Sequence, residues 1–413
     1  MCGICGRLNF DRMRPVAPQM IETMLQTISH RGPDGSGTHV SGAVGLGHRR
    51  LSIIDLNTGA QPMSNEDDSI WVVFNGEIYN FKALRKELEA GGHVFKTHSD
   101  TEVILHMYEE MGERCVTRFE GMFAFALWDR RREKLLLARD RIGIKPLYFT
   151  QTSDALIFAS EIKAIIADPD VGKHLNLEAI ERLFTFYYLP GRQTMFEGIF
   201  KLEPGHTLTV ERGKVSIKQY WDLSFDAELV NDGKRRGREF DEKAYQEAVA
   251  TTEQLVAASV RSHMMSDVPV GVLLSGGVDS TGVLGYAAIA SPSIQSPLHT
   301  FTMGFSDSAF ADERPYARMA AQRYETAHHE VSMSAADFMN FLPKYVWHME
   351  EPVCEPPAVA LYYLANFASQ SGVKVLLSGE GGDEAFGGYQ DYRNLLWLEQ
   401  LKRGFGAARP LLS

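Results

Sequence analysis

The spacing of hydrophobic and polar positions changes near residue 243 and divides the chain into two parts. Residues 1 to about 160 carry short apolar runs separated by turns, with few helical stretches between them. The predicted strands are 4–10, 44–54, 69–74, 124–128, 134–139, 147–149 and 155–159. The predicted helices are 17–29, 81–90 and 101–111. Strands that follow one another directly favour antiparallel sheets with helices outside them, an α+β arrangement.

From about Lys243 onward, strands alternate with helices. A helix carries Val249, Leu255, Val256 and Val260 on one side, and the predicted strands that follow are 270–274, 298–305, 327–331 and 373–377. Predicted helices at 280–290 and 313–323 separate the first three of these strands. This order is typical of a parallel sheet covered on both faces, an α/β fold.

A connector and a linker lie between these two parts. Residues 161–222 include a turn-rich hairpin pattern at 195–210, and residues 224–242 are polar and charge-dense. We therefore expect a first domain at 1–220 with the connector included, a linker at 221–242 and a second domain at 243–413.

The charge balance excludes two classes of partner. The chain has 42 Lys and Arg against 53 Asp and Glu, a net charge of −11. Nucleic acids and anionic membrane surfaces select basic proteins, so we expect neither as a partner. No apolar run reaches the roughly 18 residues of a spanning helix, and the N-terminus lacks the pattern of a signal peptide. We expect a cytoplasmic protein.

Two of the four cysteines, Cys2 and Cys5, form a CxxC pair at the chain start. A zinc site needs further ligands, but Cys115 and Cys354 stand alone. A redox pair usually begins a helix, whereas this pair lies in a predicted strand.

A third interpretation of Cys2 needs removal of Met1, which the small side chain of Cys2 favours. The new α-amino group would titrate near 7.7–8 and could take the proton of the Cys2 thiol. Alone, Cys2 is equally well a small apolar strand residue.

Six further motifs follow in order along the first 160 residues. They are ISHRGPDGSG at 28–37, GHRRLSIIDL at 47–56, FNGEIYN at 74–80, SDTEV at 99–103, GMFAFALWD at 121–129 and RDRIGIKPLY at 139–148. After MCGI, this series resembles the class II glutamine amidotransferases, which have an Ntn-hydrolase αββα sandwich. The resemblance implies that Cys2 attacks the side-chain amide of glutamine.

The same resemblance assigns roles to five other residues. Asn75 and the backbone N–H of Gly76 would stabilise the tetrahedral oxyanion. Arg50 would bind the α-carboxylate of glutamine, and Asp100 with Glu77 would bind its α-ammonium. The family usually has an apolar residue at the position of Cys5, which suggests that Cys2 and Cys5 could pair under oxidation and silence the site.

A second constellation is VLLSGGVDS at 272–280, a buried strand that runs into a glycine-rich turn and a helix. Such a turn offers backbone N–H groups to a phosphate, and it is not a Walker loop because no Gly-Lys-Ser/Thr follows. It resembles the pyrophosphate loop of enzymes that split ATP into AMP and pyrophosphate. This resemblance assigns pyrophosphate binding to Ser275, Gly276, Gly277 and Ser280, and Mg²⁺ binding to Asp279.

A second glycine-rich strand end, VLLSGEGGDEAFGGY at 375–389, is expected at the same sheet edge. Ser378 and Gly379 would contact the nucleotide, Glu380 the acceptor or the activated intermediate, and Asp383 a second position on Mg²⁺. Leu273 and Met303 would pack around adenine, although both fit equally well as core residues.

Together the two halves resemble glutamine-dependent asparagine synthetase. The resemblance implies glutamine, aspartate and Mg-ATP as substrates, a β-aspartyl-AMP intermediate and a homodimer. The family continues with a basic Lys-x-x-Leu-Arg motif that has no counterpart before Ser413, so synthetase chemistry is expected to depend on it. Two alternatives stay open. One is an amidotransferase for another carboxylate acceptor, and the other is a glutaminase-like regulatory partner of a separate synthetase.

Overall fold

The computed structural model describes residues 1–224, 242–291, 297–306, 312–352 and 357–404. Two compact units are present. The first contains the described residues of Met1–Ala248, Met265–Asp267 and Asn340–Pro356, and the second contains those of Val249–Met264, Val268–Met339 and Pro357–Ser413. Most of the predicted linker, 225–241, lies outside the described residues.

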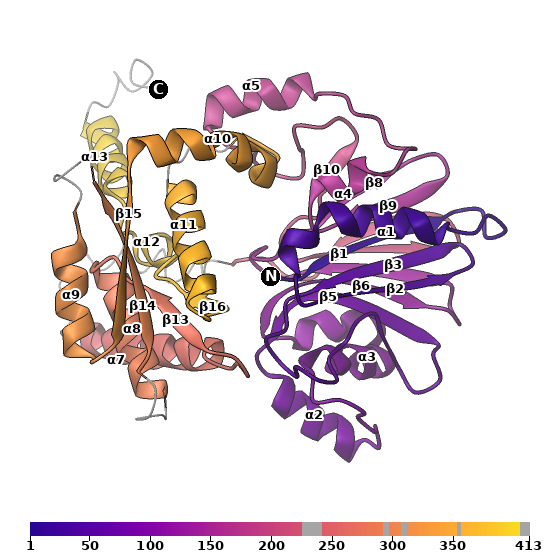
Figure 1. The fold of residues 1–413 in the computed structure, drawn as a ribbon, viewed down its shortest axis with the longest axis horizontal. Coiled ribbons are helices and arrows are strands. Elements are labelled where there is room, and N and C mark those ends of the chain that lie inside the picture. The colour runs from indigo at the N-terminus through magenta and orange to yellow at the C-terminus, as the bar shows by residue number, and fades with distance from the viewer. Residues whose placement is uncertain (225–241, 292–296, 307–311, 353–356, 405–413) are drawn as a thin grey trace. The chain divides into compact units, whose positions relative to one another are not determined.

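Two six-stranded sheets form the centre of the first unit (Figure 1). In spatial order, sheet A contains β10 (Ile199–Lys201), β8 (Tyr148–Gln151), β9 (Ala155–Ala159), β1 (Gly3–Asn9), β3 (Val44–Arg50) and β2 (Gly35–Ser41). Sheet B contains β12 (Lys214–Gln219), β11 (His206–Glu211), β7 (Lys134–Arg139), β6 (Gly121–Asp129), β5 (Ile70–Ile78) and β4 (Met63–Ser64). Every pairing within both sheets is antiparallel, as the sequence predicts.

The strand β6 shows why the two sheets pack as layers. Side chains alternate between the two faces of a strand. Phe123, Phe125 and Leu127 point into the core under the helices α2 (Phe81–Ala90) and α3 (Asp100–Met111). Ala124 and Ala126 point into the core between the sheets, together with residues of β1 and β3. Both faces of β6 are therefore buried.

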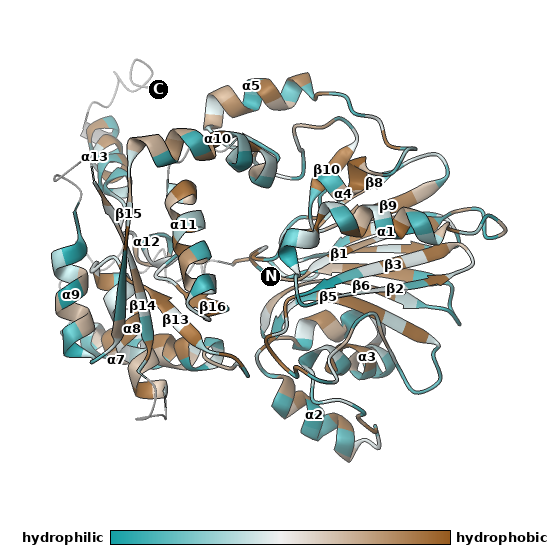
Figure 2. Cartoon of the chain, viewed as in Figure 1, coloured by the Kyte–Doolittle hydropathy of each residue, from teal (hydrophilic) through white to brown (hydrophobic). Residues whose placement is uncertain are grey.

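Helices cover the outer face of each sheet and complete an αββα sandwich. The helices α1 (Pro18–Thr27) and α4 (Ile162–Ile166) pack on sheet A through a third apolar core. Figure 2 shows brown and teal faces on α1 and α2, the pattern of helices that are buried on one side only. A further helix, α5 (Leu177–Phe186), precedes β10. This architecture confirms the predicted α+β fold of the N-terminal part.

Several strand boundaries differ from the sequence prediction. The predicted strand 44–54 ends at Arg50, and the prediction missed β2 because its seven residues have no buried position. The hairpin between β2 and β3 turns at Gly42, whose φ of +56° suits glycine. The connector does not form a separate layer, since β10 joins sheet A whereas β11 and β12 join sheet B.

The second unit contains a parallel four-stranded sheet with helices on both faces, which confirms the predicted α/β fold. The spatial order is β15 (Ala327–Met333), β14 (His299–Phe305), β13 (Val270–Leu273) and β16 (Val375–Leu377). One core joins the sheet to α7 (Glu242–His263), α8 (Val278–Ala290) and α9 (Arg314–Arg323), and another joins it to α11 (Pro357–Gln370). The remaining helices of this unit are α12 (Gly382–Phe386) and α13 (Gln390–Gly404), whereas α10 (Ala335–Met349) belongs to the first unit from Asn340 onward. None of the helices in the described ranges combines the length and the apolar composition needed to cross a membrane.

Candidate active site

Cys2 immediately precedes β1, a strand buried along its whole length between β3 and β9. The Cys2 Sγ lies 3.4 Å from the backbone nitrogen of Leu51, which donates a hydrogen bond to it, and 3.6 Å from the Leu51 carbonyl oxygen. The Arg31 Nε donates a hydrogen bond to the carbonyl of Cys2 at 2.9 Å. The thiol is therefore held where the chain leaves β3.

One pocket of the first unit collects most of the predicted glutaminase residues. Cys2, Arg50, Gly76, Glu77 and Asp100 all line it. They come from four places in the sequence: the start of β1, the end of β3, the second half of β5 and the first turn of α3. Antiparallel pairing brings β1 and β3 side by side.

Asn75 lies next to this pocket on β5, and its side chain is almost completely buried. Its amide nitrogen Nδ2 has no hydrogen-bond partner among the described residues. A buried donor without a partner is costly, so a water or a ligand is expected to accept from it. The position fits an amide that could donate a hydrogen bond to an oxyanion in the pocket.

Arg50 presents its guanidinium at the pocket because backbone carbonyls hold it. Its Nη1 donates to Leu56 at 3.3 Å, and its Nη2 donates to Ile54 at 3.3 Å and to Asp55. A Cβ on Gly59 would stand 2.6 Å from the Arg50 Nη2 and 2.9 Å from the backbone oxygen of Asp55, so the guanidinium packs directly against this glycine. The segment that follows β3 is thus folded around this cation.

Two buried carboxylates, Glu77 and Asp100, give the pocket its electrostatic character. Burial raises the pKa of Glu77 well above its ordinary value, and the neighbouring charge of Asp100 adds to the increase. Burial likewise raises the pKa of Asp100 to about 6, although hydrogen bonds from Ile78 and Ser99 oppose it. In the part of the chain that the structure describes, the buried Glu77 Oε2 has no hydrogen-bond partner. An ammonium group would neutralise this pair.

The N-terminal amine lies in the same environment. Burial, reinforced by the positive charge of Arg31, lowers the pKa of the Met1 amine to about 5. Burial also raises the pKa of the Cys2 thiol. Both shifts favour the neutral forms of the Met1 amine and the Cys2 thiol, which is the state expected of buried groups.

Cys2 and Cys5 are both free thiols. Cys5 is completely buried under α1, in the core that also contains Ile21 and Leu25. Burial raises the pKa of the Cys5 thiol far above its ordinary value, which makes it unreactive. The CxxC pair therefore places one thiol in the pocket and the other in the core, while Cys354 lies outside the described residues.

Sequence reasoning missed Lys145 and Gln61. Lys145 is buried, and its Nζ lies 3.2 Å from the Met1 Sδ, at the chain start next to Cys2. Asp140 fixes its loop by accepting the backbone N–H groups of Ile144 and Lys145, each at 2.9 Å. The motif RDRIGIKPLY contains Asp140 and Lys145, but a lysine that precedes a proline gives no sign in the sequence that its side chain is buried. Gln61 lines the pocket and accepts the Phe74 N–H at 2.7 Å.

In the second unit, the predicted phosphate loop connects β13 to the N-terminus of α8. The Ser275 and Ser280 hydroxyls lie 3.0 Å apart, and the Gly277 N–H donates to the Ser275 Oγ at 3.2 Å. Gly276 has a φ of +86°, and a Cβ there would stand 2.6 Å from the backbone nitrogen of Ala317. Glycine is required at this turn.

The second predicted loop packs directly against the first, because β13 and β16 are parallel neighbours. A Cβ on Gly379 would stand 2.8 Å from the backbone nitrogen of Ser280, and a Cβ on Gly382 would stand 2.5 Å from the Asp279 Cγ. The glycines of one loop thus make room for Asp279 of the other. The Asp279 carboxylate and the serine hydroxyls of the first loop offer oxygen atoms of the kind that a hard cation such as Mg²⁺ prefers.

The other predicted residues of this site are less closely tied to it. The Glu380 N–H donates to the Ser378 Oγ at 3.3 Å, and Asp383 lies in the first turn of α12. Leu273 and Met303 pack against the core that contains Phe301 and Leu364. Their positions agree with a core role as well as with an adenine contact.

Comparison with known proteins agrees with this division of the chain. Residues 1–221 match the glutamine amidotransferase domain family, and residues 251–412 match the asparagine synthase family. A glutamine-hydrolysing asparagine synthetase of Bacillus subtilis is 39% identical over 98% of this chain and 61% of its own length. A Methanocaldococcus jannaschii protein named for the same activity is 34% identical over 95% of this chain and 76% of its own length. The chain belongs to the glutamine-hydrolysing asparagine synthetase family.

The chain spans about three fifths of the length of the two Bacillus subtilis family members that it matches at 39% and 35% identity. Among solved structures, a glutamine phosphoribosylpyrophosphate amidotransferase from the same organism matches at 15% identity with a TM-score of 0.41, covering 80% of this chain and 81% of its own. The two family matches cover both candidate sites described above.

Proposed function

We propose that the first unit hydrolyses glutamine at Cys2 and that the ammonia serves an asparagine synthetase reaction carried by the second part of the chain. The observation that carries the glutaminase proposal is the single pocket shared by Cys2, Arg50, Gly76, Glu77 and Asp100. Residues distant in sequence that converge around a thiol form a default active-site candidate.

In the proposed reaction, Met1 is first removed, which leaves Cys2 with a free α-amino group. This amine takes the proton of the thiol, and the sulfur attacks the side-chain amide carbon of glutamine. The unpartnered Asn75 Nδ2 and the Gly76 N–H stabilise the oxyanion. The C–N bond breaks, the α-ammonium returns its proton, and ammonia leaves. Water then hydrolyses the γ-glutamyl thioester to glutamate and free Cys2.

Substrate orientation follows from the charges in the pocket. The Arg50 guanidinium binds the α-carboxylate, and the buried pair of Glu77 and Asp100 binds the α-ammonium. Because an ammonium favours the ionised carboxylates, the substrate itself lowers their pKa values. This arrangement selects a free α-amino acid over a peptide-bound glutamine.

For the second half-reaction we propose that aspartate attacks the α-phosphate of ATP to give β-aspartyl-AMP and pyrophosphate, and that ammonia displaces AMP. The Ser275–Ser280 loop and the adjoining Gly379 would hold the pyrophosphate part of ATP. Asp279 and Asp383 would hold Mg²⁺, which neutralises phosphate charge. Glu380 is proposed to contact the acceptor.

The remaining parts of the proposal concern organisation. We propose a glutaminase domain at 1–220, a linker at 221–242 and a synthetase domain at 243–413, within a cytoplasmic homodimer that uses small-molecule substrates. The two family matches, which end at 221 and begin at 251, support the position of the linker.

Amino-acid analysis of the purified chain with glutamine, aspartate and Mg-ATP tests both half-reactions. Asparagine formed with about one glutamate per asparagine is the expected result. Glutamate without asparagine would retain the glutaminase and refute the proposal that these 413 residues complete the synthetase reaction with aspartate. Absence of glutamate release would refute the role of Cys2.

A further inference from the structure

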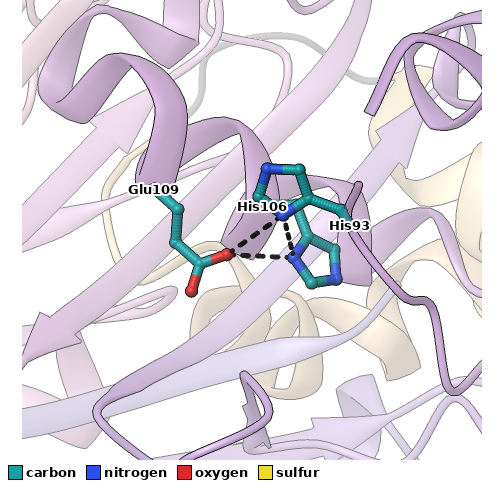
Figure 3. A group of neighbouring side chains, drawn as sticks. All are labelled: His93, His106 and Glu109. Atoms are coloured by element: carbon teal, nitrogen blue, oxygen red, sulfur yellow. Dashed lines mark hydrogen bonds and ion pairs between the residues drawn. The ribbon is translucent and has the colours of Figure 1, made fainter. Parts of the chain in front are cut away.

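A cluster of His93, His106 and Glu109 lies in the first unit, and no residue of the glutamine pocket belongs to it (Figure 3). His93 lies in the segment between α2 and α3, whereas His106 and Glu109 lie one turn apart on α3. Within the described ranges, these three form the one group of His, Cys, Asp or Glu side chains whose ligand atoms converge.

The spacing of the three inward-facing atoms matches one coordination sphere. The His93 Nδ1 is 3.1 Å from the His106 Nδ1, and the Glu109 Oε2 is 3.0 Å from the His106 Nδ1 and 3.5 Å from the His93 Nδ1. Ligands at about 2.0–2.1 Å from a tetrahedral ion are separated by roughly 3.3 Å. Dashed lines in Figure 3 join the three atoms in a triangle.

Protons alone satisfy this triangle poorly. Each imidazole Nδ1 either donates through one hydrogen or accepts through one lone pair. If both rings donate to Glu109, two N–H groups face each other across 3.1 Å. If only His106 donates, its single proton must serve both the carboxylate and the His93 Nδ1. A cation uses all three lone pairs at once.

The outer atoms of the cluster are oriented as metal sites require. The Glu109 Oε1 accepts the Asn65 Nδ2 at 2.8 Å, which leaves Oε2 for the triangle. The His93 Nε2 lies 2.9 Å from the Glu110 Oε1, and the His106 Nε2 lies 3.7 Å from the Glu102 Oε1. Metal-bound histidines commonly donate their distal N–H to a carboxylate. His93 has such a partner in Glu110, whereas the 3.7 Å between His106 and Glu102 is an ion-pair distance and not a hydrogen bond.

Charge also favours a dication. Four carboxylates surround the two imidazoles, since Glu66 lies 3.9 Å from the His106 Nδ1 in addition to Glu102, Glu109 and Glu110. His106 is almost completely buried, while about a quarter of the Glu109 side chain is exposed. The buried His106 is therefore held in place by its neighbours, while an ion can reach the cluster from solvent at Glu109.

We propose that His93, His106 and Glu109 bind one divalent transition-metal ion of the zinc class. Two imidazoles and one carboxylate suit Zn²⁺ and disfavour Mg²⁺ and Ca²⁺, which prefer oxygen ligands only. Glu66 or water completes the coordination.

Such an ion would fix the segment that leads into the glutamine pocket. The backbone N–H groups of Lys96 and Thr97 donate to Glu102, and that of His98 donates to Asp55. Asp100 of the pocket follows two residues later. A metal bridge between His93 and α3 adds a third tie to this segment, so the site has a structural role beside the catalytic pocket.

Zinc titration of the metal-stripped full chain tests the proposal. Cys2→Ala is the background, because a pocket thiol would also bind zinc. Competition with a chromogenic chelator should show one tight equivalent. His93→Gln and Glu109→Gln should each weaken this equivalent by about 100-fold or more, and Glu110→Gln by about 10–100-fold. His98→Gln, a neighbouring histidine outside the triangle, is the matched control and should retain the affinity of the background.

A second measurement does not depend on the folding of any triad variant. Co²⁺ in the Cys2→Ala chain should give the intense visible absorption of a tetrahedral site with nitrogen and oxygen ligands. Without a metal ion, burial by itself lowers the pKa of His106, but the neighbouring carboxylates of Glu102 and Glu109 raise it to about 9. If no tight equivalent binds, or if His93→Gln binds as the background does, the proposal is overturned and the cluster is a proton-linked hydrogen-bond group.

Discussion

The Asp100 carboxylate accepts the backbone N–H of Ile78 at 2.9 Å, so the first turn of α3 is tied to the end of β5. This bond joins the strand that carries Asn75 and Gly76 to the helix that carries the predicted ammonium ligand. The two parts of the pocket are thus positioned by a side chain that also contributes to it.

Asp100→Asn should separate these two roles. The amide oxygen can still accept the Ile78 N–H, but the charge that pairs with the glutamine ammonium is lost. A hydrogen bond to a charged group contributes about 1.5–3 kcal/mol, so the KM for glutamine should rise roughly 10–100-fold while kcat changes little. Glutaminase kinetics measure this. Asp154→Asn, at an exposed ion pair with Arg14, should leave KM unchanged. An unchanged KM in Asp100→Asn would contradict the assignment.

The pH dependence of glutamine binding should follow the same carboxylate. Burial raises the pKa of Asp100 from 3.8 to about 6, so the ammonium of glutamine meets an ionised partner only above that pH. The KM should therefore rise as pH falls below about 6. In the absence of glutamine, low pH favours the folded state, because the folded state binds a proton at Asp100 that the unfolded state releases. Stability against urea should decrease as pH rises from about 4 to 6.

The pH dependence of KM and the pH dependence of stability should both be weaker in Asp100→Asn, because the amide has no proton to bind at this position. Urea midpoints and KM values at pH 5, 6 and 7 measure them. Slopes equal to those of the unsubstituted chain would assign the titration to another group.

Cys2→Ala should abolish glutamate release and spare ammonia-dependent asparagine formation. The sulfur is the proposed nucleophile of glutamine hydrolysis, whereas the second unit is proposed to bind ATP and aspartate by itself. Cys5→Ala is the matched control, because the Cys5 thiol is completely buried in the core under α1. It should keep glutaminase activity within a few-fold. Residual glutamine hydrolysis in Cys2→Ala at the rate of the unsubstituted chain would refute the nucleophile.

Asp279→Asn should remove aspartate-dependent exchange between ATP and pyrophosphate while glutaminase activity persists. The side chain keeps its size in the space beside Gly382 but loses the charge that would hold Mg²⁺. Asp391→Asn, on the first turn of α13, is the control and should not affect exchange. Parallel loss of both activities in Asp279→Asn would instead indicate a folding defect.

The sequence predicted the fold class because each part has a consistent pattern. The strand β7 and the helix α2 agree with their predicted bounds to the residue. Edge strands were harder, since β2 has no fully buried residue and therefore lacks an apolar signal. The end of β3 was misjudged because the apolar run LSII continues beyond the last paired residue, Arg50.

The residues that line the proposed glutamine pocket were found through motifs rather than through periodicity. Burial of Lys145 and the fixed orientation of Gln61 depend on contacts between distant segments, which a single sequence does not display. The histidine cluster went unnoticed for the same reason. His93 and His106 lie 13 residues apart, and only the packing of the segment before α3 brings their rings together.

The sheet assignments of β10, β11 and β12 also determine where the glutaminase half can be cut from the chain. A fragment ending near residue 160 would lack all three strands, which uncovers the flank of β8 in one sheet and of β7 in the other. Each uncovered flank is a row of unpaired backbone donors and acceptors, which invites aggregation. The shortest soluble glutaminase fragment must therefore extend past Gln219, although every proposed catalytic residue precedes Thr101.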